Sequence, residues 1–148
     1  MLGDILRDRK AELHGAVLSP LDAERLASTC PTWLLDAWRE APLTGARLYL
    51  DDKVDPTGVG VSMQWMTAVE LLSEATEASP GREALPAGFV PIGKCLEGSG
   101  DPYFVSQGED SGLVRIPHSA ARGGRLNPEA IERITKSLSE FFRIAKIR

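Results

Sequence analysis

The N-terminal third of the chain has hydrophobic positions at the three-to-four-residue spacing of an α-helix. This spacing predicts a first helix over 2–13, with a serine cap and a first-position proline at Ser19-Pro20 predicting the start of a second. Helical spacing resumes after Pro31, around Trp38, and Pro42 is expected to end this third segment because proline cannot continue the hydrogen-bond ladder. We therefore expect this third of the chain to be mainly helical.

The pattern of the middle segment changes to the alternation that is typical of β-strands. Two strands are predicted at 47–50 and 59–65, joined through the turn Asp55-Pro56-Thr57-Gly58. A short helix is then predicted from 67 to about 78, because Thr67 and Glu70 have the spacing of a capping box. Proline and glycine directly after this segment are expected to end the helix.

The remainder combines β-type segments with one amphipathic segment. Strands are predicted at 89–92, 102–105 and 113–116, with glycine-rich turns between them, as in an antiparallel meander. The segment 127–145 begins with the helix-start pattern Asn127-Pro128-Glu129 and has apolar residues at helical spacing, so a long C-terminal helix is predicted there. Helices followed by strands and a final helix indicate an α+β fold in a single domain, 1–148, with no parallel βαβ sheet.

Composition agrees with an ordinary globular protein. The chain has 148 residues, of which 43% are hydrophobic and 26% are charged, and this length can bury a core without a metal or a disulfide. Cys30 and Cys95 have no disulfide-framework or metal-ligand spacing, so both are interpreted as buried thiols in a reducing compartment. Trp33, Trp38 and Trp65 are interpreted as core residues. Since we recognise neither a targeting peptide nor a membrane-length apolar run, we expect a cytoplasmic protein without membrane contact.

Charge is unevenly distributed along the chain. Residues 51–112 hold eleven acidic and three basic residues, whereas residues 113–148 hold three acidic and eight basic residues. The acidic middle is unsuited to nucleic acid, whose phosphates are bound by lysine and arginine, but it suits a basic partner protein. The simpler interpretation is that these acidic residues only solvate turns. The candidate partner-binding residues are seven acids and one tyrosine with an amphipathic ring, namely Asp51, Asp52, Asp55, Glu97, Asp101, Tyr103, Glu109 and Asp110.

The sequence offers little for catalysis. Gly98-Ser99-Gly100-Asp101 is glycine-rich, but it lacks the lysine of a phosphate-binding loop and leads into a strand, so a tight hairpin turn is predicted. The histidines and cysteines lack metal-ligand spacing, and we expect no metal and no cofactor. His118 could act as a general base with Asp101 or Asp110 in a small hydrolase, but this needs a nucleophile brought close by the fold. We therefore assign no catalytic residue.

Two consecutive motifs carry a resemblance to a known family. Phe89-Val90-Pro91-Ile92-Gly93 precedes the glycine-rich turn and Pro102-Tyr103-Phe104, and a strand through Val114-Arg115-Ile116 follows. Together with the N-terminal segment Cys30-Pro31-Thr32-Trp33, this order resembles the SUKH superfamily, which includes the cell-wall-assembly-regulator-like domains. The similarity runs from about residue 20 to 145. The chain departs from the pattern at 40–45, where the family often has an asparagine-glycine pair.

The resemblance implies both a fold and a function. It implies a twisted, mainly antiparallel sheet flanked by helices, and no catalytic residue. Many SUKH relatives are immunity proteins that neutralise a toxin by direct binding, and others have regulatory or scaffold roles. We therefore expect a non-catalytic immunity protein for a toxin, such as a basic nuclease domain, with a housekeeping regulatory or scaffold domain as the alternative.

Overall fold

Side-chain caps begin several helices where the sequence predicts them. In the computed structural model, which describes residues 1–97 and 100–148, Ser19 accepts a hydrogen bond from the Asp22 amide, and Thr67 and Glu70 form a reciprocal capping box. Within the described residues, the α-helices are α1 (Leu2–Asp8), α2 (Pro20–Leu26), α3 (Thr32–Glu40), α4 (Ala68–Thr76), α5 (Gly81–Ala84) and α6 (Leu138–Ile144). Short 3-10 helices are η1 (Lys10–Glu12), η2 (Leu85–Ala87), η3 (His118–Ala120) and η4 (Pro128–Ala130).

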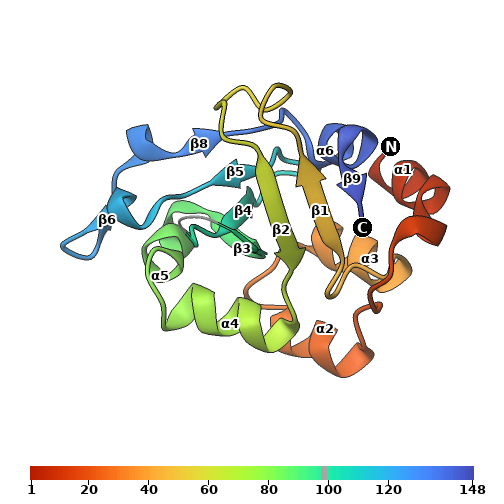
Figure 1. Ribbon diagram of the computed structural model, residues 1–148. Coiled ribbons are helices and arrows are strands. Elements are labelled where there is room, and N and C mark those ends of the chain that lie inside the picture. The colour runs from red at the N-terminus through yellow and green to blue at the C-terminus, as the bar shows by residue number, and fades with distance from the viewer. Residues whose placement is uncertain (98–99) are drawn as a thin grey trace.

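The strands form one large antiparallel sheet in the order β8-β5-β4-β3-β2-β1-β9 (Figure 1). They are β1 (Arg47–Leu50), β2 (Val61–Trp65), β3 (Phe89–Cys95), β4 (Tyr103–Ser106), β5 (Val114–Arg115), β8 (Glu132–Arg133) and β9 (Lys146–Ile147). A separate small hairpin pairs β6 (Ala121–Arg122) with β7 (Arg125–Leu126). The predicted α+β class with a mainly antiparallel sheet is confirmed. Gly98 and Ser99 of the predicted hairpin turn lie outside the described residues.

The main core joins the sheet to α3 and α6. The ring centroid of Trp65, on β2, lies 5.7 Å from that of Trp38 on α3 and 6.1 Å from that of Phe142 on α6. Successive strand residues point to opposite faces, so Tyr103 belongs to this core while Phe104 belongs to a second cluster on the other face. The sheet is therefore covered on both faces where β4 crosses it.

The two ends of the chain meet beside β1. One Nη of Arg9 donates hydrogen bonds to the carbonyl oxygens of Phe142 and Ala145, at 2.7 Å and 2.5 Å. β9 then pairs with β1, with Leu48 opposite Ile147, and Figure 1 shows α1 and α6 side by side. No helix of the described residues is long and apolar enough to cross a bilayer.

The predicted C-terminal helix over 127–145 is wrong in its first half. Asn127 caps only the 3-10 helix η4, and 132–133 forms β8 beside β5, followed by a hydrogen bond from the Ile134 amide to the Leu113 carbonyl at 2.9 Å. Helical spacing placed the apolar residues correctly inside the molecule. If 132–133 were helical, the backbone groups on the outer edge of β5 would stay unpaired. Pairing with β8 satisfies them, and this gain outweighs helix propensity. The helix begins only at its cap, Ser137.

Candidate functional site

The predicted partner-binding residues occupy two separate regions. Glu97 and Asp101 precede β4, whereas Glu109 and Asp110 follow it, so the strand separates the two pairs. The first region also includes the loop 51–60 between β1 and β2, because it forms one open pocket of about 450 Å³ with the end of β3. A single acidic face containing all of the predicted residues is therefore absent from the described chain.

Burial removes two of the predicted residues from the surface. The Asp55 side chain is fully enclosed and accepts hydrogen bonds from the Thr57 amide, the Thr57 hydroxyl and the Gly60 amide, at 2.9, 2.7 and 2.9 Å. Tyr103 is only 2% exposed, with the Arg115 guanidinium carbon 5.2 Å from its ring centroid. Neither residue can contact a partner in this conformation, so the surface role predicted for both is wrong. The cost of burying the Asp55 carboxylate is offset by these three hydrogen bonds, which order the loop, and by a buried cation opposite it.

That cation, Arg115, forms the centre of a structural charge network. Its guanidinium lies 3.5 Å from the Asp55 carboxylate and 2.9 Å from that of Glu132, and it also donates to the Gly60 carbonyl. Burial opposes its charge, but hydrogen bonds with Glu132 and Tyr103 outweigh burial and raise the pKa of Arg115. Burial raises the pKa of the Tyr103 phenol. The network holds the loop 51–60 against β5 and leaves Arg115 permanently charged.

Asp51 and Asp52 are exposed, as predicted, but their surroundings have mixed charge. The backbone amide of Lys53 donates to Asp51 and lowers its pKa, whereas the neighbouring Asp51 carboxylate raises the pKa of Asp52, because it favours the protonated form of Asp52. The same pocket is also lined by cationic residues of the C-terminus, Lys146 and Arg148. This pocket is therefore partly neutralised.

Within the described residues, a second pocket has four acidic side chains and no basic side chain in its lining. Trp33, Asp36 and Glu40 of α3 meet Glu109 and Asp110 of the β4–β5 loop around a space of about 500 Å³. We call these five residues the acidic groove. The opposite wall is formed by the first residues of α1, where the Met1 amino group lies 3.8 Å from Asp4.

Hydrogen bonds hold the two sides of the acidic groove together. Trp33 Nε1 donates to the Gln107 carbonyl at 3.0 Å and so ties α3 to the β4–β5 loop. Asp110, whose φ is 52°, accepts from the Ser139 amide and hydroxyl at 2.8 and 2.5 Å and ties the loop to α6. Trp33 packs against the main core but is only partly buried, although we predicted a core position. These hydrogen bonds hold α3, the β4–β5 loop and α6 in place, and Asp110 is the only carboxylate of the acidic groove that takes part in them.

Three groove carboxylates are exposed and form no salt bridge with the described residues. They are Asp36, Glu40 and Glu109. Glu109 and Asp110 were predicted from the sequence, whereas the two acids of α3 were not. Their spacing from Trp33, three and seven residues, places all three on one helix face and was the available signal.

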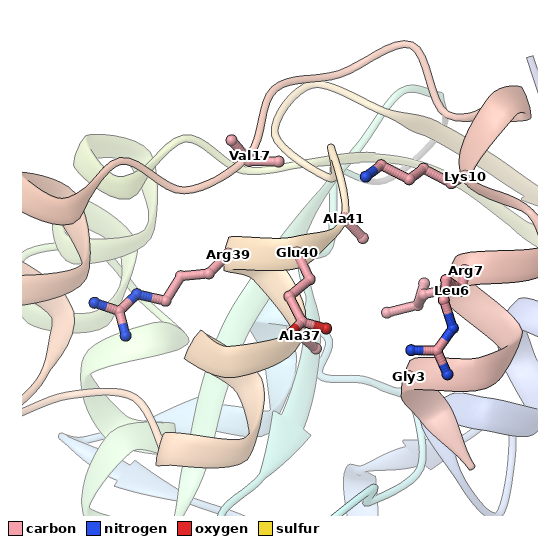
Figure 2. A pocket seen from close by; sticks show the side chains of 9 residues that line it. All are labelled: Gly3, Leu6, Arg7, Lys10, Val17, Ala37, Arg39, Glu40 and Ala41. Carbon is pink, nitrogen blue, oxygen red and sulfur yellow. The ribbon is translucent and has the colours of Figure 1, made fainter.

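A neighbouring pocket lies on the other side of Glu40 (Figure 2). Its volume is about 410 Å³, and Figure 2 shows Glu40 between α3 and α1, with Arg7 and Lys10 on the α1 side and Arg39 directed away. The two pockets share Gly3, Ala37 and Glu40. Arg7 and Lys10 therefore line the pocket next to the acidic groove on the far side of Glu40.

Of the two pairs considered for a small hydrolase, His118 with Asp101 and His118 with Asp110, the structure brings His118 and Asp101 into contact. His118 Nδ1 lies 2.6 Å from Asp101 Oδ1, which also accepts from the His118 backbone amide at 3.0 Å. Asp110 is bonded to Ser139 instead. In the described part of the chain, no hydrogen bond links the His118 ring to a serine, threonine or cysteine, and no three side chains of metal-ligand type are grouped. The hydrogen bonds of Asp101 with His118 hold the β3–β4 connection against η3.

Cys30 and Cys95 differ in exposure. Burial raises the pKa of the Cys30 thiol to about 12, so this side chain is a neutral core residue. Cys95 is only half-buried, which corrects the expectation that both thiols are buried.

Comparisons with known proteins return no relative. No protein-family model matches the chain, and neither does a curated protein or a solved structure.

Proposed function

We propose that this chain is a non-catalytic protein-binding domain that binds a basic partner through the acidic groove. The observation that carries the proposal is a pocket lined by Trp33 and by three exposed carboxylates, Asp36, Glu40 and Glu109, that form no salt bridge with the described residues. An indole beside carboxylates suits a lysine or arginine side chain, because the ring attracts a cation and the carboxylates accept its hydrogen bonds.

The arrangement on α3 is unfavourable for the helix alone. Asp36 and Glu40 are like charges at i,i+4, and Glu40 lies at the C-terminal end of α3, where the helix dipole disfavours an anion. A bound cation would relieve both penalties. This is what we expect of residues that serve binding.

The SUKH resemblance supports a specific version of this proposal. In it, the chain is a cytoplasmic immunity protein, and the partner is the basic catalytic domain of a toxin. A toxin surface that attracts nucleic acid would be attracted to the acidic groove by the same electrostatic steering. The exposed acids Asp51, Asp52 and Glu97 would add to the long-range field.

The first prediction concerns groove variants. We expect Asp36→Asn combined with Glu40→Gln to lose a stoichiometric basic partner that the wild type retains from its native cytosol. The on-rate for that partner, measured by surface plasmon resonance, should fall by about tenfold or more in the variant and also with added salt. The matched control, Asp51→Asn with Asp52→Asn, removes two acids from the mixed-charge pocket and should keep most of the affinity. A salt-independent on-rate, equal in wild type and groove variant, contradicts the proposal.

The immunity role and the regulatory or scaffold alternative share this surface but differ in the partner. An immunity protein should protect cells that produce the captured partner, and the groove variant should not. Capture of a housekeeping protein whose production is harmless favours the alternative. The hydrolase reading is favoured only by the His118–Asp101 contact, and an ester- or phosphoester-cleaving activity that disappears in His118→Ala would support it.

A further inference from the structure

A short hairpin presents two arginines side by side. β6 and β7 are joined by the two-residue turn Gly123-Gly124, whose φ angles of 60° and 75° are those that a tight hairpin turn requires of both residues. Arg122 and Arg125 lie directly opposite each other next to this turn, and both are exposed. Figure 1 shows the hairpin projecting from the body of the molecule beside α5.

The two arginine charges are left uncompensated. Like charges directly opposite on paired strands destabilise the pair. In the described chain, no carboxylate forms a salt bridge with Arg122 or Arg125. Such an arrangement favours an anion from outside the chain.

The base of the hairpin is anchored, so the two arginines have fixed attachment points. The Asn127 amide donates to the Ala120 carbonyl at 2.7 Å, directly below the last ladder pair. Ala120 is 1% exposed and Leu126 packs against the same cluster, which contains Phe104 of the sheet. Fixed attachment reduces the entropy lost when the guanidinium groups bind a ligand.

A pocket of about 410 Å³ lies against this hairpin, and its polar side chains can all donate hydrogen bonds. It is lined by Ser119, Ala120, Arg122, Arg125, Leu126 and Asn127. The Asn127 side-chain oxygen already accepts from the Glu129 amide at 3.1 Å, which leaves its NH₂ group to donate. Two guanidinium groups, a hydroxyl and an amide, with no carboxylate in the lining, are complementary to an oxyanion.

We infer that this pocket binds the phosphate group of a small phosphate monoester. Planar guanidinium groups match phosphate oxygens in pairs, and a monoester carries close to two negative charges near neutral pH. The site shares no lining residue with the acidic groove. Its ligand is an anion, whereas the partner proposed for the acidic groove is basic. It therefore extends the function beyond binding a basic partner.

The second prediction tests this site with defined ligands. In an NMR titration of the full chain, the amides of Gly123 and Gly124 should shift saturably with inorganic phosphate and with phosphoserine. Arg125→Glu should abolish the saturable shift while leaving the melting temperature equal or higher, because it creates an opposite-charge pair with Arg122. Arg122→Ala should weaken binding at least about tenfold.

Controls separate this result from general charge effects. Arg143→Ala removes an exposed arginine of α6 and should leave the titration unchanged. Shifts in the wild type that do not saturate, or that persist in a folded Arg125→Glu protein, would overturn the inference. A single-stranded oligonucleotide that binds far more tightly than either monoester would overturn the assignment to a small ligand. Tighter binding of phosphoserine than of inorganic phosphate would show that the pocket also recognises the ester group.

Discussion

Asp55 shows how one buried carboxylate organises a surface loop. Its two oxygens bind the amides of Thr57 and Gly60 and the Thr57 hydroxyl, and they face the buried guanidinium of Arg115. The carboxylate thus gives the loop 51–60 its shape and, together with Glu132, compensates the buried charge of Arg115. A residue that looks like a surface acid in the sequence is therefore part of the internal structure.

The third prediction follows from this network. Asp55→Ala should lower the free energy of unfolding by about 3–5 kcal/mol, because it leaves a buried cation with one partner fewer and frees three hydrogen-bond donors. Asp52→Ala, in the same loop but exposed, should change it by no more than about 0.5 kcal/mol. Urea unfolding followed by circular dichroism measures both. Equal stability of the two variants would mean that the network contributes nothing.

At the scale of elements, the segment after η4 illustrates competition between two structures. Residues 132–136 could extend α6, but they run beside β5 and place a backbone carbonyl close to Gly112. A Cβ on Gly112 would lie 1.9 Å from the Thr135 carbonyl oxygen. The close approach of two backbones therefore depends on a residue without a side chain.

The fourth prediction uses this contact. Gly112→Ala should cost about 1–3 kcal/mol or more of unfolding free energy, because the strand beside β5 must move away. Gly108→Ala, where an added Cβ meets nothing within 4 Å, should be nearly neutral. Thermal unfolding compares the two, and hydrogen exchange at the Ile134 amide reports whether its bond to Leu113 is weakened. A neutral Gly112→Ala variant with full protection at Ile134 would contradict the predicted contact.

At the scale of the whole molecule, contacts join the two ends of the chain to each other and to the sheet. Arg9 bridges from the N-terminal region to the last turn of α6, and β9 pairs with β1. In the core, Trp65 of β2 packs against both Trp38 of α3 and Phe142 of α6. Elements from both ends thus belong to one packed unit, which should unfold in a single transition.

The fifth prediction tests this closure. Arg9→Ala should lower the unfolding free energy by about 1–3 kcal/mol, because two carbonyl oxygens lose a charged donor. The transition should stay single, with near- and far-ultraviolet circular dichroism changing together. Arg7→Ala removes an exposed arginine of α1 and serves as the control, with an effect of about 0.5 kcal/mol or less. Early loss of helix signal alone in Arg9→Ala would show that the ends unfold independently of the sheet.

Part of the candidate site was visible in the sequence and part was not. Glu109 and Asp110 were selected because they are acids in a turn, and the structure leaves Glu109 exposed in the acidic groove. Asp36 and Glu40 were missed because charged residues on a helix are usually only its solvated face. Their meeting with the β4–β5 loop depends on contacts between distant segments, such as the bond from Trp33 to Gln107.

The caps of α2 and α4 and the strands β1 and β2 could be predicted from the sequence alone, because capping and alternation involve only neighbouring residues. These elements together indicated the α+β class. Tertiary structure decided the length of α6, the burial of Asp55 and the position of the acidic groove. Each of these depends on pairing and burial between residues far apart in the chain, and those interactions outweigh the small local preferences wherever the two disagree.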